Sequence, residues 1–277
     1  MVRRILVPLD PSGYTVSAYK HAGQLAQSHD ATVTGLAILD LPGIGAGPVS
    51  PGAYAYAKRA EQRREQDAHQ QLQALMKTCA SHLEEMGVEH DTREVSGSPA
   101  EQIIEHSAFY DLLVLGLETF FSFETSLMDD KVETHVVGKT IAPVLLVPSE
   151  FKAFGESTRV VIAYDGSLSS KRALREFTQV AAFVNPAVKL VISCDSIENA
   201  EDIFAPAKAY LSAYGYTNLE TAWTPEHIIR AMESDFIPDA DLVVAGAHAK
   251  KHFFDFGLGS LSKYLMSQTE TPVLISV

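Results

Sequence analysis

The chain contains the same succession of segments twice, and this internal repeat is the feature that most limits the folds it can adopt. Residues 4–12 (RILVPLDPS) resemble residues 159–167 (RVVIAYDGS), with Asp10 falling on Asp165 at an offset of 155 residues. The chain has 277 residues, and single domains commonly have about 100–200. The repeat and the length together predict two copies of one domain.

Two further pairs of segments follow in the same order. Residues 111–116 (DLLVLG) match 241–246 (DLVVAG) at an offset of 130, and 142–147 (APVLLV) match 271–276 (TPVLIS) at an offset of 129. The offset drops by 25 between the first and second pairs of matched segments. The first copy therefore carries about that many extra residues, which we assign to Leu41–Gln66.

Each copy alternates short apolar runs with helical patterns. The runs predict strands at residues 5–9, 31–39, 89–95, 112–115 and 144–147, and again at 160–164, 189–194, 218–223, 241–245 and 273–277. The patterns between them predict helices at residues 12–28, at 53–86 and from Pro99. Apolar strands separated by helices are typical of a parallel sheet covered on both faces. We therefore expect an α/β fold with domains at 1–148 and 159–277, joined by a polar linker at 148–158.

Charge, apolar runs and cysteine content indicate which partners and which cellular location to expect. Asp and Glu outnumber Lys and Arg by 35 to 22, a formal net charge of −13, which argues against nucleic acid or an anionic membrane as the main partner. The apolar run at the N-terminus is too short for a signal peptide, and no apolar stretch is long enough to span a membrane. The two cysteines, Cys79 and Cys194, lack metal-type spacing and give little reason to expect a disulfide. These features predict a cytoplasmic protein.

The clearest candidate for chemistry lies after the fourth strand of the second copy. Gly246 ends that strand, and Gly259-Ser260 opens a helix 13 residues later. Glycines let a backbone approach a ligand closely, and amides at a helix N-terminus favour an anion, so the pattern is typical of a phosphate-binding loop. The alternative is that Gly259-Ser260 is only a turn and a helix cap.

This pattern resembles the motif of the universal stress protein family: glycine, two residues, glycine, nine residues, glycine, then serine or threonine. Gly246, Ala249, Gly259 and Ser260 fall on its four positions, and Asp165 falls on the family's aspartate beside the adenine. The resemblance covers both copies. It implies two tandem Rossmann-like domains of the adenine-nucleotide alpha-hydrolase-like type, each with a five-stranded parallel sheet. It also implies ATP or AMP between strands one and four, and pairing of the two fifth strands within one chain, with a homodimer as a further option.

On this resemblance the second domain would bind ATP, with or without Mg²⁺, and the family's ligand contacts carry over to a set of eight residues: Ala163, Asp165, Cys194, Gly246, Ala249, Gly259, Ser260 and Leu261. Two departures bear on this expectation. Ala249 replaces the second glycine, and its methyl group could obstruct a close approach to phosphate. The loop is also rich in phenylalanine, at positions 253, 254 and 256, beside Lys250 and Lys251.

The first copy departs further from the motif. Thr119 stands at the second glycine, and Asp129-Asp130 stand where Gly-Ser is expected. Because two carboxylates would repel a phosphate, we expect no ATP in the first domain. The apolar stretch 120–128 could cover its site, be buried in the core or pack on a partner.

Other sites were weighed on their residues. His248 and His252 lie four apart with Asp255 nearby, but a metal site would require a helix where we expect a loop, so none is predicted. No Gly-x-Gly-x-x-Gly or Walker sequence follows a first strand, and no receiver-type acidic pair accompanies Asp10 or Asp165. No catalytic nucleophile or base can be assigned.

Two functions remain from different classes. The first is a stress-response sensor or regulator that binds an adenine nucleotide in the second domain, with at most slow hydrolysis. The second is a protein-interaction module in which both nucleotide sites are degenerate and the acidic surface contacts a client protein.

Overall fold

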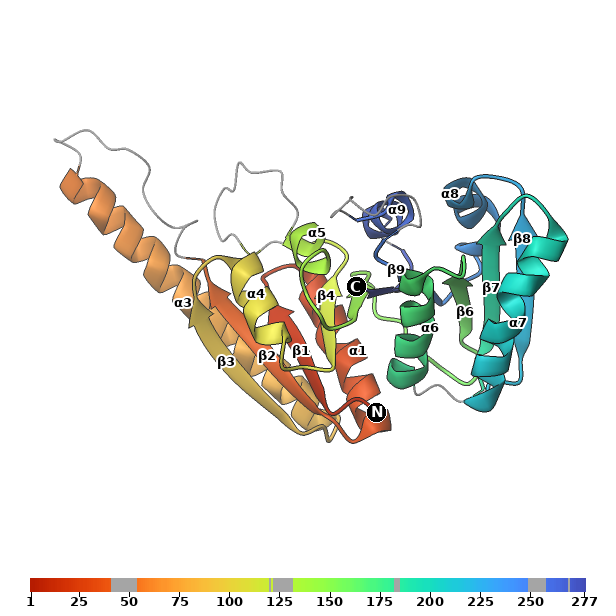
Figure 1. The fold of residues 1–277 in the computed structure, drawn as a ribbon. Coiled ribbons are helices and arrows are strands. Elements are labelled where there is room, and N and C mark those ends of the chain that lie inside the picture. Colours follow the sequence, from red (N-terminus) through yellow and green to blue (C-terminus); the bar gives the residue numbers. More distant parts are fainter. Residues whose placement is uncertain (41–53, 120, 122–131, 182–184, 249–257, 269) are drawn as a thin grey trace.

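The computed structural model describes residues 1–40, 54–119, 121, 132–181, 185–248, 258–268 and 270–277. Within them, ten strands form one sheet in the order β3-β2-β1-β4-β5-β10-β9-β6-β7-β8 (Figure 1). The strands are β1 (Arg4–Leu9), β2 (Thr32–Leu39), β3 (His90–Ser96), β4 (Leu112–Gly116), β5 (Val144–Val147), β6 (Arg159–Ala163), β7 (Ala187–Ser193), β8 (Leu219–Thr224), β9 (Leu242–Gly246) and β10 (Val273–Ser276).

The sheet consists of two equivalent halves, which we call the first half (β1–β5) and the second half (β6–β10). Inside each half, neighbouring strands are parallel. The halves meet where β5 and β10 pair antiparallel, with Leu145 opposite Leu274. The predicted α/β fold is confirmed, and the fifth strands pair as the resemblance implied.

Helices cover both faces of the sheet because alternate strand residues point to opposite sides. In β1, Ile5 and Val7 belong to one buried cluster, while Leu6 belongs to the other. The first cluster includes residues of α1 (Gly13–His29), α3 (Tyr54–Glu85), α6 (Leu168–Val180) and α7 (Ile197–Ala213). The second includes residues of α4 (Pro99–Ser107), α5 (Val132–Val137), the π-helical turn η2 (Met232–Phe236) and α9 (Ser260–Ser267), and it packs against α8 (Ile228–Ala231).

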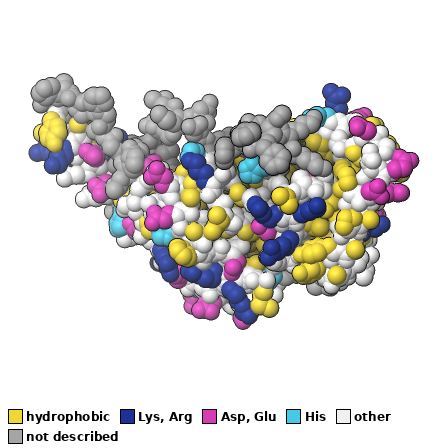
Figure 2. All heavy atoms as spheres, in the orientation of Figure 1, with side chains coloured by type: hydrophobic (Ala, Val, Ile, Leu, Met, Phe, Trp, Pro, Cys, Tyr) yellow, Lys and Arg dark blue, Asp and Glu magenta, His cyan; other side chains and the backbone are white. Residues whose placement is uncertain are grey.

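The long helix α3 contains part of the predicted insertion. It has 32 residues, against 17 in its counterpart α7. Its buried residues are Ala68, Leu72, Cys79 and Leu83, and none lies in the first 14 residues of the helix. The beginning of the helix projects beyond the sheet (Figure 1), and hydrophobic side chains are visible at that end of the molecule in Figure 2. Tyr54 and Tyr56, in the first turn of the helix, are exposed.

The linker between the halves is packed against α1. The side chain of Gln24 donates to the carbonyl of Phe154 and accepts from its amide, at 2.5 and 3.0 Å. The rings of Phe151 and Phe154 contact His21, which is fully buried. Burial lowers the pKa of His21, which outweighs the hydrogen bonds that raise it, so the imidazole is neutral at pH 7.

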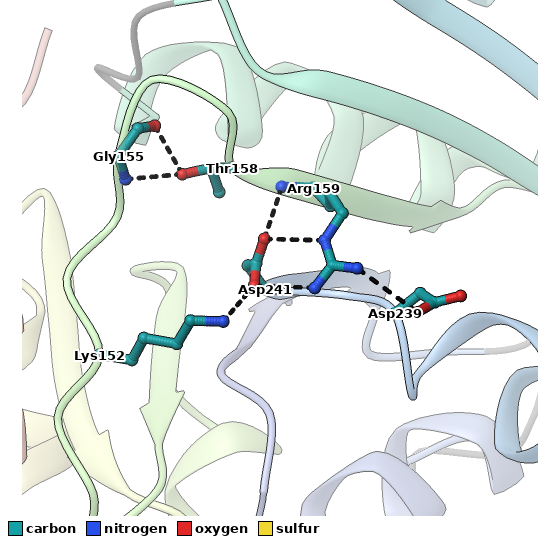
Figure 3. A network of polar contacts seen from close by, with 6 residues as sticks. All are labelled: Lys152, Gly155, Thr158, Arg159, Asp239 and Asp241. Atoms are coloured by element: carbon teal, nitrogen blue, oxygen red, sulfur yellow. Dashed lines mark hydrogen bonds and ion pairs between the residues drawn. The ribbon is translucent and has the colours of Figure 1, made fainter.

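A carboxylate at the start of strand four ties each half together at its amino end. Asp241 accepts from the backbone amide of Arg159, from its guanidinium and from Lys152 (Figure 3). Desolvation would raise the pKa of Asp241, but these hydrogen bonds and the positive charge of Arg159 lower it well below its usual range. Asp111, its counterpart, accepts from the amides of Arg3 and Arg4.

Candidate functional site

A cavity of about 410 Å³ opens at the carboxyl ends of β6, β7 and β9 in the second half. Here β6 lies between β7, which follows it in sequence, and β9, to which the chain crosses over. Such reversals of strand order are where open parallel sheets bind ligands. The volume lies within the range of about 300–1,000 Å³ that is common for small-molecule sites.

Seven of the eight candidate residues lie around this cavity: Ala163, Asp165, Cys194, Gly246, Gly259, Ser260 and Leu261. They come from the ends of β6, β7 and β9 and from the beginning of α9. The eighth, Ala249, lies outside the described residues, as do Lys250, Lys251 and the three loop phenylalanines.

The turn between β6 and α6 fixes the carboxylate of Asp165 at the cavity. Its Oδ1 accepts the backbone amide of Ser167 at 2.9 Å. Gly166 between them has φ +71°, a left-handed conformation that other residues rarely adopt. Ser167 then caps α6 by accepting the amide of Ser170 at 3.2 Å. The turn therefore presents a half-buried carboxylate to the cavity.

The opposite wall is the beginning of α9. Gly259 is its N-cap residue, and because glycine has no side chain the cap contributes no side-chain hydrogen bond to the first turn. The hydroxyl of Ser262 donates to the carbonyls of Gly246 and Ala247 at 2.9 and 3.1 Å, and the amide of Gly259 donates to Ala247 at 2.8 Å. These bonds hold the amide end of α9, where the helix dipole is positive, against the end of β9.

Gly246 has a packing role in addition to lining the cavity. A Cβ atom at this position would overlap the hydroxyl of Ser169 and lie 2.7 Å from its carbonyl carbon. The glycine therefore lets α6 pack closely on β9, whatever the cavity holds. Gly116 in the first half meets Tyr14 in the same way, and Tyr14 is the residue that aligns with Ser169.

The cavity is also lined by residues that the sequence did not single out as ligand contacts: Tyr164, Ser170, Val191, Ile192, Ser193, Ile203, His227, Ile228, His248 and Ser262. The sequence signal for some of them was the apolar run that predicts β7, since its last residues, Val191, Ile192 and Ser193, lie at the carboxyl end of the strand. His227 lines the wall as the N-cap of α8, where its ring nitrogen accepts the amide of Ile229. Among the described lining residues there is no Lys or Arg.

At the equivalent position of the first half, described side chains form hydrogen bonds with one another. Asp10 is 2% exposed and accepts hydrogen bonds from the hydroxyls of Ser12 and Thr15. Pro11 stands where the second half has Gly166, and proline cannot take a positive φ. The hydroxyl of Tyr14 donates to Glu118 at 3.3 Å. Burial, and then the charge of Glu118, raise the pKa of Tyr14, so the phenol stays protonated.

Metal and disulfide chemistry find no support in the part of the chain that the structure describes. No group of three or more His, Cys, Asp or Glu residues there could hold a metal ion, and His252 and Asp255 lie outside it. Both cysteines are free, and burial raises the pKa of Cys79 to about 12, which keeps it a thiol. No described helix is both long and apolar enough to cross a bilayer.

A comparison with models of protein families shows which family the chain belongs to. The model of the universal stress protein family matches residues 1–148. The chain belongs to this family. A universal stress protein of Synechocystis sp. is 22% identical over 293 residues, which cover 99% of each protein. One from Methanocaldococcus jannaschii is 28% identical over 149 residues, covering 53% of this chain and 82% of the relative.

Solved structures agree on the fold. A universal stress protein from Archaeoglobus fulgidus superposes with a TM-score of 0.67 at 19% identity, covering 99% of this chain and 95% of that one. The tandem arrangement of two universal stress protein units is therefore the architecture of this chain.

Proposed function

We propose that this universal stress protein binds an adenine nucleotide in the cavity of the second half and acts in the cytoplasm as a nucleotide-dependent sensor or regulator of the stress response. The observation that carries the proposal is the convergence of seven family-motif positions, from three strands and one helix, on one cavity of about 410 Å³. On this proposal, residues 1–148 and 159–277 are two units with different roles.

We assign the two walls to the two ends of the nucleotide. Ala163, Asp165 and Cys194 would face the adenosine, because the resemblance places the aspartate beside the adenine. The beginning of α9, with Gly259, Ser260 and Leu261, would face the phosphates, since helix amides and the positive end of the helix dipole stabilise an anion. Mg²⁺ would accompany ATP through the phosphates.

We propose that the first half binds no nucleotide in this mode. Its aspartate is buried among its own hydroxyl groups, and Tyr14 packs over Gly116. Asp129 and Asp130, which align with Gly259 and Ser260, would add negative charge where the phosphates would lie. Their placement is outside the described residues.

We propose binding without committed catalysis. The titratable side chains that line the described cavity are Tyr164, Asp165, Cys194, His227 and His248. The ring nitrogen of His227 is used as a helix cap, and Asp165 is held by the amide of Ser167. Neither is arranged as a dedicated general base, so at most slow hydrolysis is expected.

The test is to measure nucleotide bound to the purified protein and thermal unfolding with and without Mg-ATP. At a hundredfold excess over Kd, ATP should stabilise the wild type by about 2.7 kcal/mol. Gly259→Asp, which introduces the residue that the first half carries, should abolish both signals. Ala205→Asp, a charge added on the exposed face of α7, should leave them unchanged.

An absence of bound nucleotide and of any ATP-dependent shift in the wild type would rule out the sensor. The chain would then be better described as a protein-interaction module that retains a nucleotide-binding fold.

A further inference from the structure

A second cavity, of about 320 Å³, opens at the other end of the same half of the sheet. It lies at the amino ends of β6 and β7, beside β8, and the segment 235–239 borders it. Its apolar lining includes Val161 and Phe236, which belong to the same buried cluster, and its polar lining consists of Arg159, Lys189, Glu220, Asp235 and Asp239. None of these residues belongs to the proposed nucleotide site.

The first half fills the equivalent place with the ring of Tyr110. The guanidinium of Arg4 lies over this ring, 4.4 Å from its centroid, and Tyr110 is 8% exposed. Tyr110 thus packs beside the beginning of β1.

The two halves have the same backbone arrangement here, so the comparison is direct. The amide of Tyr110 donates to the carbonyl of Ser107 at 3.0 Å, and that of Ala240 donates to Ile237 at 2.9 Å. At the next position, Asp111 donates to Arg4 and Asp241 to Arg159, both at 2.9 Å. At the offset of 130, Ala240 therefore stands where the first half has Tyr110.

The surroundings of the missing ring are retained. Arg159 aligns with Arg4, and its guanidinium donates to Asp239, the counterpart of Phe109, whose carbonyl accepts from Arg4 (Figure 3). In the second half, Glu220 of β8 lies opposite Lys189 of β7. At the corresponding position of the first half, Asp91 of β3 lies opposite Thr34 of β2.

The N–H groups of Arg159 point in the guanidinium plane toward the carboxylates of Asp239 and Asp241. Hydrogen bonds in that plane leave the planar faces of the guanidinium for stacking on an aromatic ring. The rim carries the exposed Lys189–Glu220 ion pair at 3.1 Å, which offers both a donor and an acceptor to a hydroxyl group.

We propose that this second cavity binds a small phenolic molecule, whose ring stacks on Arg159 as Tyr110 stacks on Arg4. The ring rests on Val161 and Phe236, and the hydroxyl group lies toward Lys189 and Glu220. This site is independent of nucleotide binding, and its occupant replaces an aromatic side chain that the first half supplies from its own sequence.

The test uses p-cresol, which is the tyrosine side chain without its backbone, in calorimetric titration of the wild-type chain. One p-cresol should bind, and cyclohexanol, a saturated ring with a hydroxyl group, should bind several-fold more weakly because it cannot stack. Ala240→Tyr should fill the cavity, remove p-cresol binding and raise the unfolding temperature. Gly259→Asp, at the nucleotide cavity, should leave p-cresol binding unchanged.

The chain also supplies a positive control. Tyr110→Ala should open the same cavity in the first half and raise the number of bound p-cresol molecules from one to two. Independently of any variant, p-cresol should shift the backbone amide resonances of Lys189 and Ala240 in the wild type. The proposal is overturned if the wild type does not bind p-cresol, if Ala240→Tyr still binds it, or if the shifts centre on Ser193 and Gly246.

Discussion

The first strands of the two halves end at aligned aspartates, and the residues around these aspartates differ. Asp10 is buried and accepts hydrogen bonds from Ser12 and Thr15. Asp165 is half-buried and lines a cavity, and Ser170, which aligns with Thr15, donates to the carbonyl of Ser167 instead. The turn after the first strand therefore holds a buried, hydrogen-bonded carboxylate in one half and a carboxylate that lines a cavity in the other.

Two tyrosines account for much of the remaining difference. Tyr14 and Tyr110 cover the carboxyl and amino ends of the first half, whereas the second half has Ser169 and Ala240 at the same positions. The chain neighbours of these two small residues, Ser170 and Asp239, line the two cavities of the second half. The two halves thus share one fold, and on our proposals side-chain size decides which half accommodates a ligand.

The largest loss of stability is expected at Gly116 and Gly246, the aligned glycines at the ends of β4 and β9. Gly116→Ala and Gly246→Ala should each destabilise the protein by up to about 3 kcal/mol, because the added methyl group would collide with Tyr14 or Ser169 in a tightly packed contact. Urea unfolding measures both. Gly13→Ala, where an added Cβ meets nothing within 4 Å, is the control. A much smaller effect at Gly246 than at Gly116 would mean that the two halves do not share this packing.

The aspartates should separate stability from binding. Asp10→Ala should cost about 2 kcal/mol, because it leaves the buried hydroxyl of Thr15 without its acceptor. Asp165→Ala should lower the stability of the ligand-free protein by less, but it should reduce the thermal shift produced by Mg-ATP. Asp10→Ala should retain that thermal shift. Equal losses of stability with no change in the ATP response would remove the distinction drawn between the two halves.

The smallest effect concerns acid stability. The pKa of Asp241 is lowered in the folded state, so its contribution is present above the unfolded-state value of about 3.9 and is lost as the pH falls through the folded-state value. Asp241→Asn should therefore lower stability at pH 7 by about 1 kcal/mol or less, since Arg159 and Lys152 are largely exposed, and should flatten the loss of stability below pH 5.

Asp111→Asn is the matched control for Asp241. One oxygen of Asp111 accepts both backbone amides, and an asparagine can keep these bonds. Identical pH profiles for the two variants would contradict the assigned role of Arg159 and Lys152.

The sequence was sufficient for the fold because the apolar runs are nearly continuous and recur in the same order. Strand β5 was predicted to the residue, and the predicted helix 53–86 corresponds to α3 at Tyr54–Glu85. The position of the nucleotide-type cavity also followed, since motif residues at the ends of parallel strands must meet at one edge of the sheet.

Other features depended on contacts between distant segments and could not be predicted from single motifs. The reason for Gly246 is the close approach of Ser169, which lies 77 residues earlier. The lining histidine His227 is the N-cap residue of α8, a helix of only four residues, too short to show a periodic pattern. The second cavity could not be predicted from the sequence, because nothing in the sequence shows that Tyr110 packs on the arginine that begins the first strand or that Ala240 takes its place in the second half.

The antiparallel pairing of β5 with β10 also has a consequence for regulation. In an assembly of separate subunits, dilution or competing partners can change which units sit together. Here the covalent connection keeps the effective concentration of the second unit high at any dilution. The ratio of the first half to the second half is therefore fixed at one to one, whatever else the chain associates with.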